Sequence, residues 1–351
     1  MIDKLGTDGV RLWVSSIDCS GEAVVSDVLL QNVQQVFRKI RNTCRFLLSN
    51  LYDFNHEKDA LALDDLRLID QYALQQLFIV NNDILNAYKR YDFTAVFHKL
   101  GDYCSTDLSS FYLDIIKDRL YVEQADGHAR RSAQTSCYYV LDTLTKLMAP
   151  ILSFTAEQVS DSYQKNKKKS IHLQQFAKIQ DVVTFVAARV AQMQPGYDTS
   201  FSKGASVSEI AIEKIVSLAQ HESLWVTLKA VRSALLKAIE ELRAVGSLKH
   251  SLEARLTVFF GNDDALKGQM DELRIMLKNN DQILEDFFKE FVIVSQFSVA
   301  PSSDGLEQSS LLPGLFVKVE SALGDKCPRC WNWDQTEHEH KLCQRCQKIV
   351  K

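Results

Sequence analysis

The feature that most constrains this chain is a helical spacing of apolar residues that persists, with short interruptions, from residue 26 to residue 164. Between Leu29 and Leu51, apolar side chains recur every three or four residues, which is the period of one face of an α-helix. The same spacing appears at about 66–91, 94–121, 129–148 and 155–164. Only 5 prolines occur in 351 residues, so long helices can form without interruption. Successive amphipathic helices with short links predict a helical bundle.

The ends of the bundle are indicated by capping residues and by loops. Ser26 or Asp27 can cap the first helix, and Pro150 should end the fourth, because the residue before a proline avoids the α-helical region. Before Ser26, a short apolar run at 10–14 predicts a lone strand or the end of a helix. A lone strand is not a domain, so we expect residues 1–25 to be the remnant of a preceding domain and Met1 to be an internal position of a longer protein.

Residues after the bundle form a second domain in our prediction. The loop sequences at 194–196 and 202–204 indicate a boundary. Beyond it the pattern predicts helices at about 207–244 and 263–278, and strands at 255–261, 291–297 and 315–319. We therefore expect a mainly α protein in which a helical bundle (26–180) is followed by a small α+β domain (206–324) and a cysteine-rich segment (325–351).

Four cysteines near the C-terminus form two Cys-x-x-Cys pairs, Cys327 with Cys330 and Cys343 with Cys346. This spacing lets four thiolates surround one Zn²⁺ at about 2.3 Å and leaves no position open for water, so the site would be structural. Two disulfides or an iron–sulfur cluster are the alternatives. The first is disfavoured in a cytosolic chain, and the second uses other cysteine spacings. A segment this short cannot bury enough apolar surface to form a core of its own. Metal binding should therefore supply most of its folding free energy.

Aromatic and basic residues surround these cysteines, notably Arg329, Trp331, Trp333 and Arg345. Exposed tryptophans beside arginines suit stacking on unpaired bases and contacts to phosphates. Trp331 could instead pack over the metal cluster as its hydrophobic lid, and both roles can hold for different tryptophans.

The first bundle helix carries a second basic element. Arg38, Arg41 and Arg45 fall on the flank of its apolar face, Asn42 lies beside them, and Phe46 falls away from the apolar face. An arginine ridge with an amide and an aromatic ring suits recognition of single-stranded RNA. The alternative, which composition alone favours, is a solvated flank whose Phe46 packs on a neighbouring helix.

Other charged residues predict structure instead of binding. Lys117, Asp118 and Arg119, together with Arg130 and Arg131, are predicted to form interhelical ion pairs that hold the bundle. The lysine run at 165–169 is predicted to be a solvated loop, with a phosphate contact as the alternative.

Composition excludes several classes of protein. The formal net charge is −4, so nucleic-acid binding has to use local basic patches. No stretch of about 18 apolar residues is present to span a bilayer, and the N-terminus carries Asp3 and Asp8 where a signal peptide has an apolar core. We therefore expect a cytoplasmic protein without a membrane partner. A Gly-rich phosphate loop, a Gly-x-Ser-x-Gly motif and a His-Glu-x-x-His motif are all missing, so no catalytic residue is predicted.

A series of motifs in this order resembles the C-terminal part of bacterial-type isoleucyl-tRNA synthetases, which are class I aminoacyl-tRNA synthetases. The motifs are Asp3–Ser16, Arg38–Leu48, Phe111–Tyr121, Arg130–Thr135, Met148–Glu157, Ser251–Ala254, Cys327–Trp331 and Cys343–Cys346. Each motif is weak alone, but their order is specific, and the terminal finger separates isoleucine enzymes from valine and leucine enzymes. The chain departs from the family at Ser160, where a tryptophan is usual, and at Lys249 and His250, where the family tends to have glycine.

The resemblance implies an anticodon-binding bundle, a small α+β domain and a terminal four-cysteine finger with one Zn²⁺ per chain. It implies tRNA(Ile) as partner, not DNA, and a monomer. The residues that would contact tRNA are Arg38, Arg41, Asn42, Arg45, Phe46, Arg329, Trp331, Trp333 and Arg345. The parent reaction charges tRNA(Ile) with isoleucine and consumes ATP. In the family the ATP-binding and editing domains precede this segment, so we expect ATP only in the missing catalytic domain and no activity from this chain alone.

Two other interpretations of the chain share some of these motifs. A free-standing RNA-binding module of helices and zinc finger, without a catalytic partner, differs only in whether the cell makes the preceding half. A DNA-repair glycosylase has a similar four-cysteine finger, but those enzymes resemble one another in an N-terminal Pro-Glu nucleophile, and this chain opens Met1-Ile2.

Overall fold

The computed structural model describes residues 2–17, 25–164, 169–176, 221–261, 264–335 and 342–350. The chain divides into two compact units. Unit 1 comprises residues 1–114 and 125–216, and unit 2 comprises residues 115–124 and 217–351. A short piece of the bundle sequence thus belongs to the C-terminal unit. Within the described ranges, no helix is both long and apolar enough to cross a bilayer.

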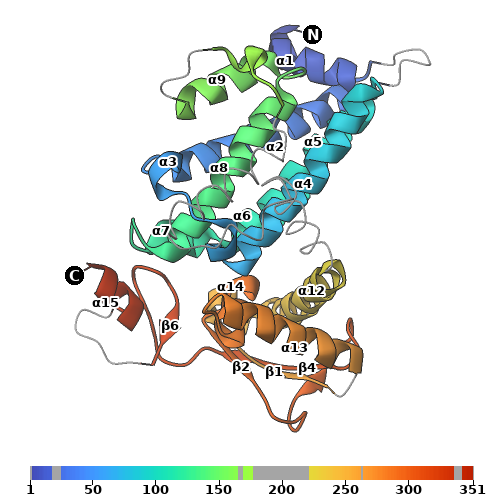
Figure 1. Cartoon of the computed structure of the whole chain (residues 1–351). Helices are drawn as coiled ribbons and strands as arrows, with labels where there is room; N and C mark the ends of the chain where they lie inside the picture. The colour runs from blue at the N-terminus through green and yellow to red at the C-terminus, as the bar shows by residue number, and fades with distance from the viewer. Residues whose placement is uncertain are drawn as a thin grey trace, which may run out of the picture. The chain divides into compact units, whose positions relative to one another are not determined.

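Unit 1 is built of helices, as the apolar spacing predicts (Figure 1). Its elements are α1 (Ile2–Ser15), α2 (Asp27–Asn50), α3 (His56–Asp59), η1 (Leu63–Asp65), α4 (Leu68–Lys89), α5 (Phe93–Asp102), the π-helix η2 (Tyr103–Tyr112), α8 (His128–Met148), α9 (Ser153–Tyr163) and η3 (Ile171–Leu173), with the short α6 (Leu113–Ile115) at the unit boundary. Four of the predicted helices are confirmed as α2, α4, α8 and α9, with ends within a few residues of the prediction.

The core of unit 1 lies where α2, α4 and α8 pack together. Ile40 and Leu47 of α2, Ile84 of α4 and Leu144 of α8 are all inaccessible to solvent. The Ser26 hydroxyl accepts a hydrogen bond from the backbone N–H of Leu29 at 3.3 Å, which confirms the predicted cap. These contacts fix the buried face of α2 and therefore decide which of its residues face solvent.

The segment predicted as one helix over 94–121 is interrupted. After α5 the backbone widens into the π-helix η2, where the Ser109 hydroxyl donates to the carbonyl of Cys104 at 2.6 Å and the Ser110 hydroxyl donates to that of Thr106 at 2.7 Å. Such side chains compete for helix carbonyls and favour irregular turns. The chain then passes through Ile116 (φ −84°, ψ 0°) into a separate helix, α7 (Lys117–Val122), in unit 2.

The first residues form helix α1 in unit 1, so of the two predicted alternatives the helical one is confirmed. Arg11 donates to the carbonyls of Ile151 at 2.8 Å and Pro150 at 2.7 Å, and the Asp8 carboxylate accepts from the backbone N–H of Thr155 at 2.7 Å. These bonds tie α1 to the start of α9.

Unit 2 combines α7 with a small α+β fold and the cysteine-rich segment. Its further elements are α12 (Glu222–Ala244), η5 (Ser251–Glu253), β1 (Ala254–Phe260), α13 (Asp264–Asn279), α14 (Leu284–Val292), β2 (Gln296–Val299), β3 (Glu307–Gln308), β4 (Leu315–Ser321), β5 (Asp325–Lys326), β6 (Trp333–Asp334) and α15 (Gln344–Val350). The larger sheet has the strand order β2-β1-β4-β3, with β1 parallel to β2 and antiparallel to β4.

Helices α12, α13 and α14 pack on this sheet (Figure 1). Alternate residues of β1 are buried, from Ala254 to Phe260, as in a strand with one covered face. The ring of Phe260 lies 5.6 Å from that of Phe288 on α14.

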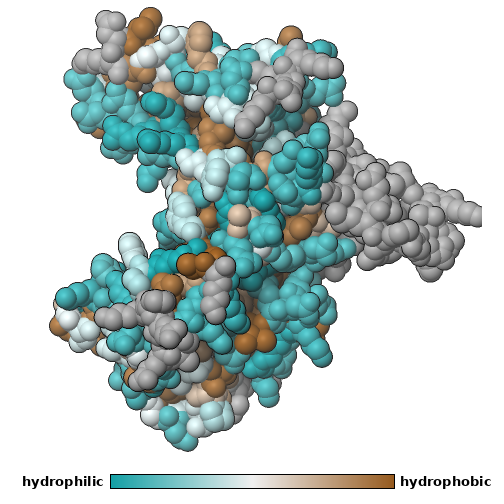
Figure 2. All heavy atoms as spheres, turned by 90° about the vertical axis from the view of Figure 1, so that its left-hand side faces the viewer, coloured by the Kyte–Doolittle hydropathy of each residue, from teal (hydrophilic) through white to brown (hydrophobic). Residues whose placement is uncertain are grey.

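On the face drawn in Figure 2, hydrophilic residues predominate and hydrophobic residues form small separate patches.

One strand prediction in this unit is wrong in its first half. Residues 291–292 end helix α14, Ile293 adopts a left-handed conformation (φ 62°, ψ 57°), and strand β2 begins only at Gln296. Phe287, Phe288 and Phe291 lie on the buried face of α14. A short apolar run such as residues 291–294 fits a buried strand as well as the end of a buried helix, so the sequence pattern alone does not separate the two. The strands predicted at 255–261 and 315–319 and the helix predicted at 263–278 are confirmed as β1, β4 and α13, whereas residues 207–220 of the predicted long helix lie outside the described residues.

Candidate metal centre and nucleic-acid interface

The four predicted metal ligands lie together. The sulfur atoms of Cys327, Cys330, Cys343 and Cys346 are all within 4.8 Å of one another, and all four side chains are buried. The Sγ atoms of Cys330 and Cys343 are 3.6 Å apart. In a tetrahedral site with Zn–S bonds of about 2.3 Å, neighbouring sulfurs lie about 3.8 Å apart. The donor set and its spacing therefore fit a four-coordinate zinc ion.

A tight turn presents the first pair of cysteines. Strands β5 and β6 pair antiparallel on either side of it, the backbone N–H of Trp331 donates to the carbonyl of Cys327 at 2.9 Å, and that of Cys327 donates to Asn332 at 2.9 Å. Gly324 precedes the turn at φ +92°, and a Cβ there would lie 2.0 Å from the carbonyl oxygen of Asp334, so this position requires glycine. The second pair lies at the start of α15.

Hydrogen bonds favour the thiolate form of Cys327. Burial raises the pKa of this thiol, but backbone N–H groups of Cys330, Cys343 and Arg329 outweigh it and lower the pKa to about 6. The N–H of Cys343 lies 3.4 Å from the Cys327 sulfur. The thiolate is the form that binds metal. Arg329 also directs its guanidinium at the Cys346 sulfur, at 3.5 Å.

The two tryptophans of this segment have different surroundings. Trp331 is 60% exposed at a positive φ of 65°, and the ammonium group of Lys326 lies 5.4 Å from the centre of its ring. Trp333 is half-buried, and within the described part of the chain its buried indole N–H has no hydrogen-bond partner. Among the described residues, Val122 and Leu342 are the hydrophobic residues that close the thiol cluster. Trp331 is therefore not the lid of the metal site and offers an open stacking surface.

Arg345 is bound within unit 2. One guanidinium nitrogen donates to a carboxylate oxygen of Asp118 at 2.8 Å, and the other contacts the second oxygen of Asp118 and the carboxylate of Glu123, the latter at 3.3 Å. Burial lowers the pKa of Arg345, but the bonds to Asp118 outweigh it, so the pKa is raised. The sequence indicated Arg345 as a tRNA contact, and no local signal reveals partners more than 200 residues earlier.

The arginine ridge of α2 is open to solvent. Arg38, Arg41, Asn42 and Arg45 are all exposed, and Phe46 is half-buried. Among the described residues, none of the three arginines is paired with a carboxylate. Arg41 lies 5.6 Å from the ring centre of Phe37. The ridge is therefore a set of cations whose charge is not neutralised by neighbouring side chains, next to an amide and an aromatic ring.

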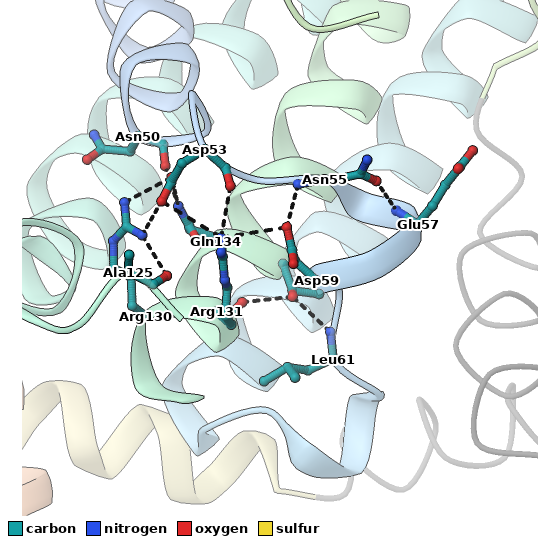
Figure 3. Close-up of polar contacts among 11 residues, drawn as sticks. Asn50, Asp53, Asn55, Glu57, Asp59, Leu61, Ala125, Arg130, Arg131 and Gln134 are labelled. Carbon is teal, nitrogen blue, oxygen red and sulfur yellow. Dashed lines mark hydrogen bonds and ion pairs between the residues drawn. The ribbon is translucent and has the colours of Figure 1, made fainter. Parts of the chain in front are cut away.

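The sequence did not predict a network of hydrogen bonds and ion pairs that holds the loop following α2 (Figure 3). Arg130 of α8 donates to both carboxylate oxygens of Asp53, at 2.6 and 3.0 Å, and Gln134 donates to the same carboxylate at 2.9 Å and to the carbonyl of Asn50 at 2.8 Å. Arg131 lies 3.8 Å from the carboxylate of Asp59. The predicted ion pairs of Arg130 and Arg131 are confirmed: Asp53, the partner of Arg130, lies in the loop after α2, and Asp59, a partner of Arg131, ends the short helix α3.

This network shifts the ionisation of both partners. Burial raises the pKa of Asp53, but the hydrogen bonds from Arg130 and Gln134 outweigh it and hold the pKa below its usual value. Burial lowers the pKa of Arg130, and the bond to Asp53 outweighs it and raises the pKa. The ion pair therefore holds the loop that follows α2 on helix α8, and Gln134 binds the last residue of α2, Asn50.

Comparison with known proteins gives one family and a set of close relatives. Residues 70–258 match the family model described as the anticodon-binding domain of tRNA ligase. The isoleucine–tRNA ligase of Syntrophotalea carbinolica is 36% identical over 356 residues, which cover 100% of this chain and 33% of that protein. Those of Lawsonia intracellularis (35%, covering 100% and 33%) and Erwinia tasmaniensis (34%, covering 99% and 33%) are similarly related. The chain spans about a third of the length of the curated relatives it matches.

Proposed function

Because the chain belongs to the family of tRNA ligases that carry this anticodon-binding domain, and resembles isoleucine–tRNA ligases over its whole length, we propose that it is the tRNA(Ile)-binding C-terminal part of such a ligase. In this role it recognises the anticodon region, so that ATP-dependent charging of tRNA(Ile) with isoleucine can occur in a catalytic domain. Binding far from the reacting groups supplies free energy and orientation that the reaction centre uses.

The observation that carries this proposal is the exposed arginine ridge of α2. A protein with a net charge of −4 gains affinity for RNA only where cations gather locally. Arg38, Arg41 and Arg45 provide such a group, with guanidinium planes that match phosphate geometry, and Asn42 provides an amide that can bond to base edges. Trp331, exposed and bordered by Lys326, provides a second surface on which an unpaired base can stack.

The thiol cluster supports a structural Zn²⁺, one per chain, held by Cys327, Cys330, Cys343 and Cys346. The bound ion would supply folding free energy and no reaction chemistry, because four sulfurs fill its coordination positions. We place this protein in the cytoplasm as a monomer with tRNA, not DNA, as its nucleic-acid partner.

Alanine substitutions on the two surfaces should weaken tRNA binding in different ways. Arg41→Ala and Arg45→Ala each leave one phosphate without its cation, so they should weaken binding to all tRNAs similarly. The slope of log affinity against log salt concentration should become shallower by about 0.7–0.9 for each phosphate that is no longer neutralised. Phe46→Ala and Trp331→Ala should cost about 1–3 kcal/mol, because a base can no longer stack on the ring. Fluorescence titration with tRNA(Ile) and a non-cognate tRNA at several salt concentrations measures both effects.

Arg274→Ala, which removes an exposed arginine of α13, is the matched control and should leave tRNA affinity unchanged. Melting curves recorded alongside separate binding from stability. If Phe46 and Trp331 serve packing alone, their variants will lose thermal stability and bind tRNA normally once corrected for the folded fraction. Unchanged affinity in all four variants would refute the proposed RNA-binding surface.

The polypeptide of these 351 residues should show no isoleucine-dependent exchange of pyrophosphate into ATP. Its sequence contains no motif that would bind ATP or activate isoleucine. The full-length isoleucine–tRNA ligase of Syntrophotalea carbinolica serves as positive control in the same assay. Exchange above background with the purified polypeptide would contradict the proposal that this chain binds tRNA and that a separate catalytic domain uses ATP and isoleucine.

A further inference from the structure

Helix α7 is a piece of the bundle sequence that folds with the C-terminal unit. It is attached there by a buried ion pair: the guanidinium of Arg119 lies 2.5 Å from the carboxylate of Glu290 on α14, and the two side chains are only 3% and 16% exposed. Breaking such a pair leaves a buried charge without compensation, so α7 is held firmly.

The same helix reaches the metal-binding segment. Val122 at its end is 7% exposed and belongs to one buried cluster with the four cysteines, against which Leu342 also packs. The segment from 325 to 350 therefore shares its small hydrophobic core with a residue some 200 positions earlier in the chain. Access of water and chelators to the sulfurs depends on this contact, because the apolar shell around a metal controls solvent access.

Two carboxylates close to Val122 in the sequence bind an arginine of the metal-binding segment. Asp118 binds Arg345 through both oxygens, and Glu123 adds a further contact at 3.3 Å. Arg345 stands between the ligands Cys343 and Cys346 in sequence, so its backbone is part of the knuckle. Bidentate arginine–carboxylate pairs fix geometry as well as charge.

A zinc site with four thiolates attracts cations. Zn²⁺ with four thiolates carries a formal net charge of −2. Arg329 lies 3.5 Å from the Cys346 sulfur, and Arg345 lies between the ligands Cys343 and Cys346 in the sequence. Asp118 and Glu123 hold Arg345 in place.

From these contacts we propose that α7 is part of the metal centre: Val122 closes the thiol cluster, and Asp118 and Glu123 anchor Arg345, which lies between two of the ligands in the sequence, so that metal retention by the C-terminal knuckle depends on α7. This inference rests on the proposed zinc site. It assigns Arg345 to the metal centre as a positioning residue, in place of the tRNA contact that the sequence indicated.

The test measures zinc release from the full 351-residue chain. Each protein is loaded with one Zn²⁺, challenged with excess EDTA, and followed with a colorimetric zinc indicator. Arg345→Ala and the double variant Asp118→Asn/Glu123→Gln should each release zinc about 10–100-fold faster than the original chain, the range typical when an outer-shell partner is removed. Arg345→Lys should be intermediate, because it keeps the charge and loses the two-pronged bond.

Two exposed charges provide matched controls. Lys348→Ala removes a cation from the same helix α15, and Asp126→Asn removes a carboxylate shortly after α7; both should release zinc within twofold of the original rate. Cobalt(II) loaded in place of zinc should give the sulfur-to-metal charge-transfer bands of a four-thiolate site in every variant, which shows that the ligands themselves are intact.

Combining the substitutions distinguishes a direct contact from general destabilisation. If Arg345 acts through Asp118 and Glu123, adding Asp118→Asn/Glu123→Gln to Arg345→Ala should accelerate release no further. Additive effects, or release within twofold of the original rate in both Arg345→Ala and the double variant, would overturn the proposal. A chain that binds no zinc at all would instead refute the proposed zinc site itself.

Discussion

Replacing Cys343 by serine should abolish metal binding and unfold the C-terminal knuckle, residues 325–350. The hydroxyl is a poor substitute for a thiolate, and three remaining sulfurs leave the ion exposed. Structural zinc sites in small fingers contribute about 10–16 kcal/mol of binding free energy, which is also their folding free energy. Among the described residues, the knuckle shows no other source of this size, because its buried cluster there contains the four cysteines and Val122, with Leu342 beside it.

Zinc content of the purified chain should fall from about one ion to almost none in Cys343→Ser. Hydrogen exchange should become fast at residues 325–335 and 342–350, while α4 and α8 keep their protection, because these helices belong to unit 1 and the knuckle belongs to unit 2. Cys137→Ser, which alters a buried single cysteine of α8, is the matched control and should retain its zinc. Full metal content in Cys343→Ser would disprove the ligand assignment.

Replacing Arg130 by alanine should destabilise unit 1 by about 3–5 kcal/mol, the cost of removing one partner of a buried ion pair. The Arg130 side chain is 6% exposed and that of Asp53 20%, and the substitution leaves the Asp53 carboxylate without its two strongest bonds. Urea unfolding followed by circular dichroism measures the loss. Arg90→Ala, which breaks an exposed pair with Asp92 at 3.9 Å, is the control and should cost less than about 1 kcal/mol.

The effect of Arg130→Ala should shrink in acid. The pKa of Asp53 is lowered in the folded chain, so the stabilisation by this pair is complete above the unfolded-state pKa of about 3.9 and is lost as the pH falls through the lower folded-state pKa. The difference in unfolding free energy between the original chain and Arg130→Ala should therefore be smaller at pH 3 than at pH 6. An equal difference at both pH values would show that the carboxylate charge of Asp53 does not contribute.

The helices could be predicted from the sequence because each of them buries one face and repeats its apolar residues at one period. Local chemistry also decides a helix end such as Ser26, whose hydroxyl caps the turn that follows it. The prediction was wrong at 291–295, where the short apolar run of residues 291–294 fits the end of a helix as well as a strand, and the packing of Phe288 against the sheet favours the helix. The ten-residue π-helix after Asp102 was missed because the apolar spacing of the sequence does not separate an α-helix from a slightly wider π-helix.

The metal ligands and the proposed tRNA-binding residues of α2 could be predicted from the sequence around them. Arg345 could not, because its partners Asp118 and Glu123 lie more than 200 residues earlier in the chain. Two Cys-x-x-Cys pairs indicate a metal site by themselves, since a two-residue gap holds both sulfurs of a pair on one turn. Exposure of Arg38 and Arg45 follows from the apolar face of their own helix. By contrast, only the tertiary structure decided that Arg345 binds Asp118, that Val122 closes the thiol cluster and that Arg130 binds Asp53. An ion pair between distant residues has no period and no fixed spacing, because its energy depends on a distance that exists only after the chain has folded.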